Sequence, residues 1–150
     1  MKKLFSTILV LGLILVGNAY AGSLIPLNKY LQDNDEYLQD PITITYVVNR
    51  CSAVYLYVGA ITKKKDEKTA NQFVDAHLKA LRFSNEILII QMNYSKKLAS
   101  EKNIKDIDGM YSYYEKDGQD NFTRTGNYIQ NSYIGEDVVK CNEIMNVLYN

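Results

Sequence analysis

Apolar residues recur every three or four positions along most of this chain, which is the spacing of one face of an α-helix. The first such series begins after Asp40-Pro41, a pair suited to the cap and the first turn of a helix. It continues through Ile44, Val47, Cys51, Val54, Val58 and Ile61. Residues 42–47 also alternate as a β-branched strand would. The longer series favours a helix over this strand.

Two further helices are predicted downstream by the same spacing. One runs from about residue 65 to residue 101, and its stripe contains Phe73, His77, Ala80, Ser84, Ile87, Gln91, Tyr94 and Leu98. The other runs from about Ile104 to Ile129 and includes Ile107, Tyr111, Tyr114 and Phe122. Gly109, Gly118 and Gly126 weaken it, because each glycine costs about 1 kcal/mol relative to alanine. We expect a kink or a break near Gly118.

A last helix is predicted from about Gly135, with Glu136 and Asp137 in a first turn where the helix dipole favours acids. Four helices with short connections predict an all-α, up-and-down four-helix bundle. A short helical segment within residues 23–39 is expected to dock across one end of the bundle. Its apolar residues are Leu27, Tyr30, Leu31 and Leu38, and its acidic residues, Asp33, Asp35 and Glu36, are expected to face solvent.

The first 21 residues have the three-part organisation of a secretory signal peptide. Lys2 and Lys3 precede an apolar run, and the small residues Ala19 and Ala21 precede the expected cleavage site before Gly22. The apolar run is about 13 residues long, whereas a spanning helix needs roughly 20. We therefore expect cleavage, no stable membrane insertion afterwards, and a periplasmic or secreted protein.

Charge limits the partners of the mature single domain, residues 22–150. The whole chain has 17 basic and 17 acidic residues, and loss of Lys2 and Lys3 leaves 15 against 17, a formal charge of −2. The one basic cluster, Lys63-Lys64-Lys65, is followed at once by Asp66 and Glu67. Nucleic-acid binding is not expected, because no basic block is present to neutralise phosphates.

The two cysteines, Cys51 and Cys141, lie on the inward stripes of the first and last bundle helices. These helices are neighbours in an antiparallel four-helix bundle, so we expect a structural disulfide between them. It would close a loop of about 90 residues, which the chain-entropy model credits with roughly 4–5 kcal/mol. The alternative, a redox-active pair, lacks a Cys-x-x-Cys motif.

Motifs for catalysis, metals and cofactors are absent from the sequence. Gly-x-Ser-x-Gly does not occur, and the Glu-x-x-His pair of diiron bundles is missing, since Val74 stands three residues before His77. We therefore expect no cofactor, no metal and no enzymatic activity. The alternative hypothesis is an enzyme or a cofactor-carrying bundle centred on His77, the only histidine, with a carboxylate or a methionine as its partner.

Four residues are candidates for ligand binding. Arg50 lies on a strongly apolar helix and must reach the surface, meet a carboxylate, or bind an anion in a groove between helices. Tyr111 and Tyr114 share a helix face, and tyrosine rings are suited to the wall of a binding site. His77 is the fourth. The sequence thus favours a non-enzymatic protein that binds a protein or a small molecule, and it leaves the partner and the oligomeric state open.

Overall fold

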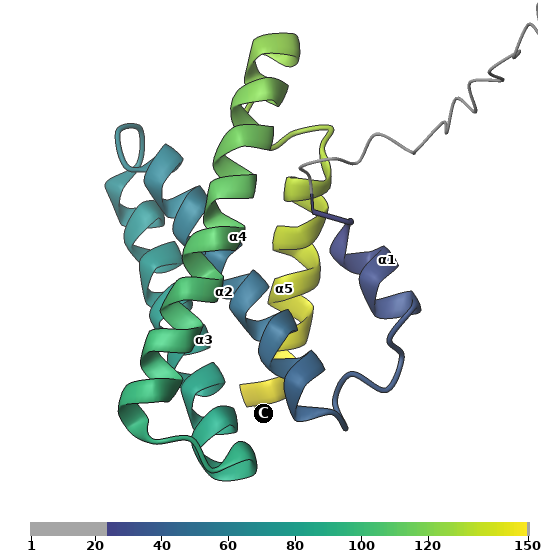
Figure 1. Cartoon of the computed structure of the whole chain (residues 1–150). Helices are drawn as coiled ribbons and strands as arrows, with labels where there is room; N and C mark the ends of the chain where they lie inside the picture. The colour runs from purple at the N-terminus through teal and green to yellow at the C-terminus, as the bar shows by residue number, and fades with distance from the viewer. Residues whose placement is uncertain (1–23, 150) are drawn as a thin grey trace, which may run out of the picture.

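The computed structural model describes residues 24–149, and they form five helices. These are α1 (Leu27–Gln32), α2 (Pro41–Thr62), α3 (Glu67–Met92), α4 (Lys96–Thr125) and α5 (Tyr133–Tyr149). Figure 1 shows that α2 to α5 alternate in direction and that α1 lies beside α5. The predicted four-helix bundle with a short N-terminal helical segment is confirmed. The expected signal peptide, residues 1–21, lies outside the described residues.

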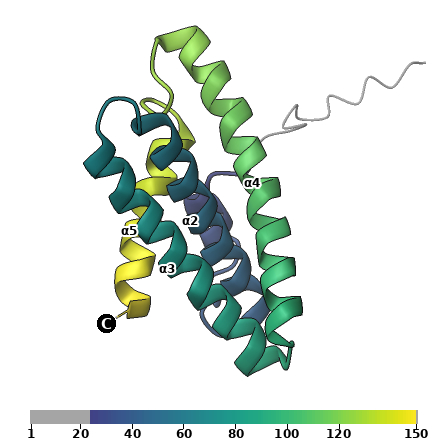
Figure 2. The ribbon, with the colours of Figure 1, turned by 90° about the vertical axis from the view of Figure 1, so that its left-hand side faces the viewer.

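Helix α2 is the centre of the bundle. It packs against α3, α4 and α5 (Figure 2), and 14 of its 22 residues are buried. By length and composition alone it is apolar enough to cross a membrane, a test that the core helix of a bundle also passes. Its apolar residues surround the whole helix because neighbours cover nearly every face, as expected for a central helix.

Side-chain caps begin three of the helices. The Asp40 carboxylate accepts a hydrogen bond from the Thr43 amide at the start of α2, as the sequence predicted, and Asp66 does the same for Thr69 in α3. Ser95 Oγ accepts from the Leu98 amide at the start of α4. Each cap satisfies a backbone N–H that has no partner within its helix.

The predicted single helix over residues 65–101 is wrong, because the chain turns after Met92. Asn93 adopts a left-handed conformation with a φ of 56°, and Ser95 then caps the next helix. Asn tolerates the left-handed region and Ser is a preferred N-cap, so two adjacent local signals end one helix and start another. The apolar spacing continues across this turn, and periodicity alone therefore does not reveal it.

The predicted break near Gly118 is also wrong, since α4 is continuous from Lys96 to Thr125. It ends at Thr125, four residues before the predicted Ile129, and Gly126 caps it with a φ of 75°. Gly118 is a contact point: a Cβ built there would lie 1.8 Å from the Tyr57 hydroxyl oxygen. The ring of Tyr57 from α2 thus occupies the space that a larger residue would need.

Replacement of Gly118 by Ala is expected to lower the free energy of unfolding by about 1–3 kcal/mol, the usual cost of overpacking a core. Tyr57 is only 2% exposed and lies against the rings of Tyr111 and Tyr114, so it cannot swing aside freely. The matched control is Gly109→Ala in the same helix, where a Cβ would meet nothing within 4 Å. This change should stabilise the protein by about 0.5–1 kcal/mol. Urea denaturation that shows both variants stabilised would contradict the Tyr57 contact.

The segment before α2 matches its prediction in part, since α1 packs along the side of α5 and not across one end of the bundle (Figure 1). Leu27 is fully buried, whereas Asp33, Asp35 and Glu36 are exposed as expected. Leu38 is 49% exposed, because α1 ends at Gln32 and the chain then runs through turns. Leu38 is therefore not part of a continuous amphipathic face, contrary to the expectation.

Candidate functional site

A disulfide between Cys51 and Cys141 joins α2 to α5, as predicted. Both residues are fully buried, and their Cα atoms are 5.2 Å apart. The bond spans 90 residues of sequence and connects the first long helix to the last. Persistent disulfides are typical of proteins from oxidising compartments outside the cytoplasm.

Arg50, next to Cys51, forms a buried ion pair with Asp137 of α5. Its Nη2 and Nε atoms donate to Asp137 Oδ2 at 2.6 and 3.0 Å, and Nε also donates to the Tyr114 hydroxyl at 3.1 Å. Burial alone would lower the pKa of Arg50, but Tyr114 and Asp137 outweigh it and hold that pKa above its ordinary value. Arg50 thus meets a carboxylate, one of the alternatives that the sequence left open.

Tyr114 and Leu27 also donate hydrogen bonds to Asp137. The Tyr114 hydroxyl donates to Oδ2 at 2.6 Å, and the Leu27 amide of α1 donates to Oδ1 at 2.8 Å. Burial and the charge of Asp137 raise the pKa of Tyr114 well above its usual value, so the hydroxyl keeps its proton. The Asp137 carboxylate of α5 is therefore hydrogen-bonded to α1, α2 and α4, through Leu27, Arg50 and Tyr114.

Neither Arg50 nor Tyr114 is accessible to a ligand in this arrangement, because both are 0% exposed. Sequence reasoning placed Asp137 only as an acid in the first turn of the last helix. A signal was present, however: Asp137 lies four residues before Cys141 and hence on the same helix face. An inward cysteine therefore implied an inward carboxylate one turn earlier.

His77 of α3 is half-buried against Ser52 of α2. Its Nδ1 atom lies 2.8 Å from Ser52 Oγ and 3.2 Å from the Ser52 carbonyl oxygen. Burial lowers the pKa of His77 below its ordinary value, so the imidazole is neutral at pH 7. Ser52 is fully buried, and the pair joins two helices rather than facing solvent. Within residues 24–149, no group of three His, Cys, Asp or Glu residues is arranged to hold a metal ion.

Tyr111 is half-buried and contacts the ring of Tyr57 edge-on, with ring centroids 6.1 Å apart. Tyr114 stacks on the same ring from 6.3 Å. The structure thus brings Tyr111 and Tyr114 together around a buried third tyrosine. The main cavities formed by residues 24–149 are lined by none of Tyr111, Tyr114 and His77.

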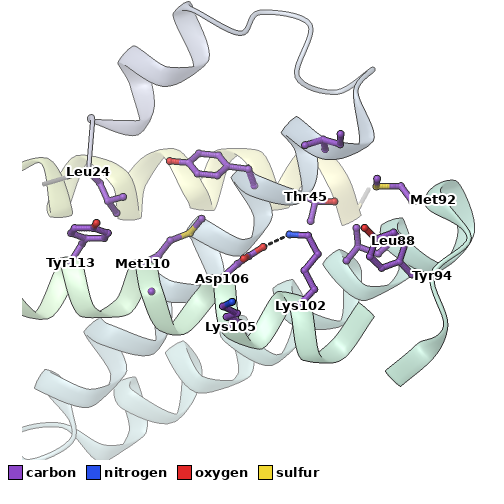
Figure 3. A pocket seen from close by; sticks show the side chains of 13 residues that line it. Leu24, Thr45, Leu88, Met92, Tyr94, Lys102, Lys105, Asp106, Met110 and Tyr113 are labelled. Atoms are coloured by element: carbon purple, nitrogen blue, oxygen red, sulfur yellow. Dashed lines mark hydrogen bonds and ion pairs between the residues drawn. The ribbon is translucent and has the colours of Figure 1, made fainter. Parts of the chain in front are cut away.

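The most apolar cavity among those described is an open groove of about 560 Å³ between α2, the end of α3 and the first half of α4 (Figure 3). Its floor is buried core: Thr45, Leu88 and Met110 are 3%, 1% and 9% exposed. We call it the apolar groove, and the remaining residues that line it are Leu24, Ile42, Tyr46, Met92, Tyr94, Lys102, Lys105, Asp106, Gly109 and Tyr113. None of the four sequence candidates lines it.

Charged residues of the apolar groove come only from α4. Lys102 is paired with Asp106 one turn later, and Figure 3 shows this contact along the groove. Lys105 lines the groove and has no ion pair within the described part of the chain. Two cations and one anion leave this wall with a formal charge of +1.

Comparison of the chain with protein-family models, with curated proteins and with solved structures found no match. Function must therefore be inferred from the groove and the groups around it.

Proposed function

We propose that this protein is an exported, non-enzymatic binding protein whose ligand occupies the apolar groove. The observation that carries the proposal is the groove itself. Its volume of about 560 Å³ lies within the range of small-molecule sites, about 300–1,000 Å³. Its floor is continuous with the core of the bundle. An apolar ligand bound there would therefore extend the core, and its apolar surface would be removed from water.

Two features support export to the periplasm or the extracellular space. The Cys51–Cys141 disulfide is suited to an oxidising compartment. The N-terminal sequence ends in Ala19-Tyr20-Ala21, which is typical of a signal-peptidase site. The mature protein would then begin at Gly22, two residues before Leu24 at one end of the groove.

The buried polar side chains support binding rather than catalysis. Arg50, Tyr114 and Asp137 are hydrogen-bonded to one another, although the buried Nη1 of Arg50 has no partner within the described residues, and His77 contacts Ser52 at the α2–α3 interface. A catalytic group must reach its substrate within hydrogen-bond distance. In the groove, the ionisable side chains are those of Lys102, Lys105, Asp106 and three tyrosines, a set suited to orienting a ligand.

Fluorescence titration with N-phenyl-1-naphthylamine, a neutral apolar probe that brightens on leaving water, tests this function. We expect saturable binding to the wild-type protein. Gly109→Trp should abolish it, because Gly109 lines the groove and its missing side chain leaves open space. Gln119→Trp, at an exposed position of α4 outside the groove, is the matched control and should bind normally. Absence of binding, or equal binding by both variants, would overturn the proposal.

A further inference from the structure

We infer that the ligand of the apolar groove is an amphipathic anion, a molecule with one acidic head and one extended apolar tail. The inference rests on the proposed function and assigns its ligand class. Three observations carry it: the elongated shape of the groove, its apolar lining, and the position of its cations.

The groove follows α4 for a considerable length. Its lining residues on that helix extend from Lys102 to Tyr113, which corresponds to about 16 Å along the helix axis. Figure 3 places Leu24 and Tyr113 at one end, and Met92 and Tyr94 at the other. An elongated site of this kind fits an extended hydrocarbon chain.

The path of the tail is set by Gly109 and its neighbours. A Cβ at Gly109 would meet nothing within 4 Å, so the surface of α4 is lowest there. Beyond it lie Met110, in the buried floor, and Tyr113 and Leu24, which are partly exposed. A tail that starts near Lys105 and passes over Gly109 would pack against these side chains, and both the tail and the side chains would lose contact with water. Each CH₂ group that leaves water in this way favours binding.

The head group is set by Lys105 and Lys102. Lys105 has no ion pair within residues 24–149, and Lys102 is shared with Asp106. An acid head placed there meets two exposed lysines at the edge of an apolar site, where the wall carries a formal charge of +1 that attracts an anion. A cationic head would be repelled by the net positive wall, and a neutral head would gain no charge attraction from the exposed Lys105.

Competition against bound N-phenyl-1-naphthylamine tests the ligand class, with three probes of equal tail length: dodecanoate, dodecanol and dodecyltrimethylammonium. All are used below their micelle-forming concentrations, with circular dichroism to confirm that the helices persist. We expect dodecanoate to bind most tightly and the cation least. The preference for dodecanoate should decrease as salt is added, because salt screens the lysines.

The variant Lys105→Glu should weaken dodecanoate binding on the order of tenfold, because it replaces an attraction by a repulsion at close range. It should weaken dodecanol binding far less, because the neutral head has no charge for the new carboxylate to repel. Lys116→Glu makes the same charge change at an exposed position of α4 outside the groove and is the control. Dodecanoate binding that responds equally to both variants would overturn the head-group assignment.

The two proposals fail in different ways. If the fluorescent probe binds and the three amphiphiles compete equally, the groove is a binding site and the anionic class is wrong. If the probe does not bind wild-type protein, the proposed function fails, and the ligand class fails with it. A selective loss of dodecanoate binding in Lys105→Glu supports both.

Discussion

Replacement of Asp137 by Ala is expected to lower the free energy of unfolding by about 3–5 kcal/mol, the usual cost of breaking a buried ion pair. The variant leaves the Arg50 guanidinium fully buried with no counter-charge. It also removes the acceptor of the Tyr114 hydroxyl and of the Leu27 amide. Because the Leu27 contact holds α1 against α5, we expect the segment before α2 to loosen first.

Urea denaturation of Asp137→Ala and wild type measures this loss. Glu101→Ala removes an exposed i,i+4 pair with Lys97 and is the control, expected to cost less than about 0.5 kcal/mol. The double variant Arg50→Met, Asp137→Leu leaves no unpaired buried charge, so it should be more stable than Asp137→Ala alone. A loss below about 1 kcal/mol in Asp137→Ala would show that the buried pair does not stabilise the bundle as argued.

Loss of the Cys51–Cys141 disulfide is expected to cost roughly 4–5 kcal/mol, because the bond closes a long loop and restricts the unfolded chain. Denaturant midpoints of the oxidised protein should therefore lie well above those of protein that was reduced while unfolded and then refolded. Reduction must be carried out on the unfolded chain, since both cysteines are 0% exposed in the folded one.

The variant Cys51→Ala, Cys141→Ala provides the control for this measurement. It should have the lower midpoint with or without reductant, because no bond is left to break. Equal midpoints for oxidised and reduced wild-type protein would mean that the bond does not limit the unfolded chain as the loop-entropy model requires.

The core of α2 combines apolar packing with polar contacts on consecutive residues. Next to Arg50, Asn49 is fully buried, accepts from Ser84 Oγ at 2.6 Å and donates to Asn103 Oδ1 at 2.9 Å. Buried polar groups cost stability unless they are hydrogen-bonded, so α2 must keep one register against α3 and α4. We expect this to favour a single alignment of the bundle.

Several features of the fold could be predicted from the sequence because they depend on neighbours along the chain. Asp40-Pro41 marks a helix start, since a cap and its target amide are three residues apart. The apolar spacing of α2 and α5 placed Cys51 and Cys141 on inward faces, and two cysteines allow one pairing. The turn at Asn93 also depends on neighbouring residues, but the apolar spacing continues across it and so does not predict it.

Tertiary structure alone decided the remaining features. Gly118 is required because a ring from another helix lies over it, and the acceptor for Arg50 is 87 residues away in sequence. The apolar groove likewise joins Ile42, Leu88 and Lys105, which no spacing rule connects. Periodicity reveals which face of a helix is buried. It does not reveal which helix covers that face, because that choice depends on the packing of side chains distant in sequence, and the candidate binding site exists only as a result of that packing.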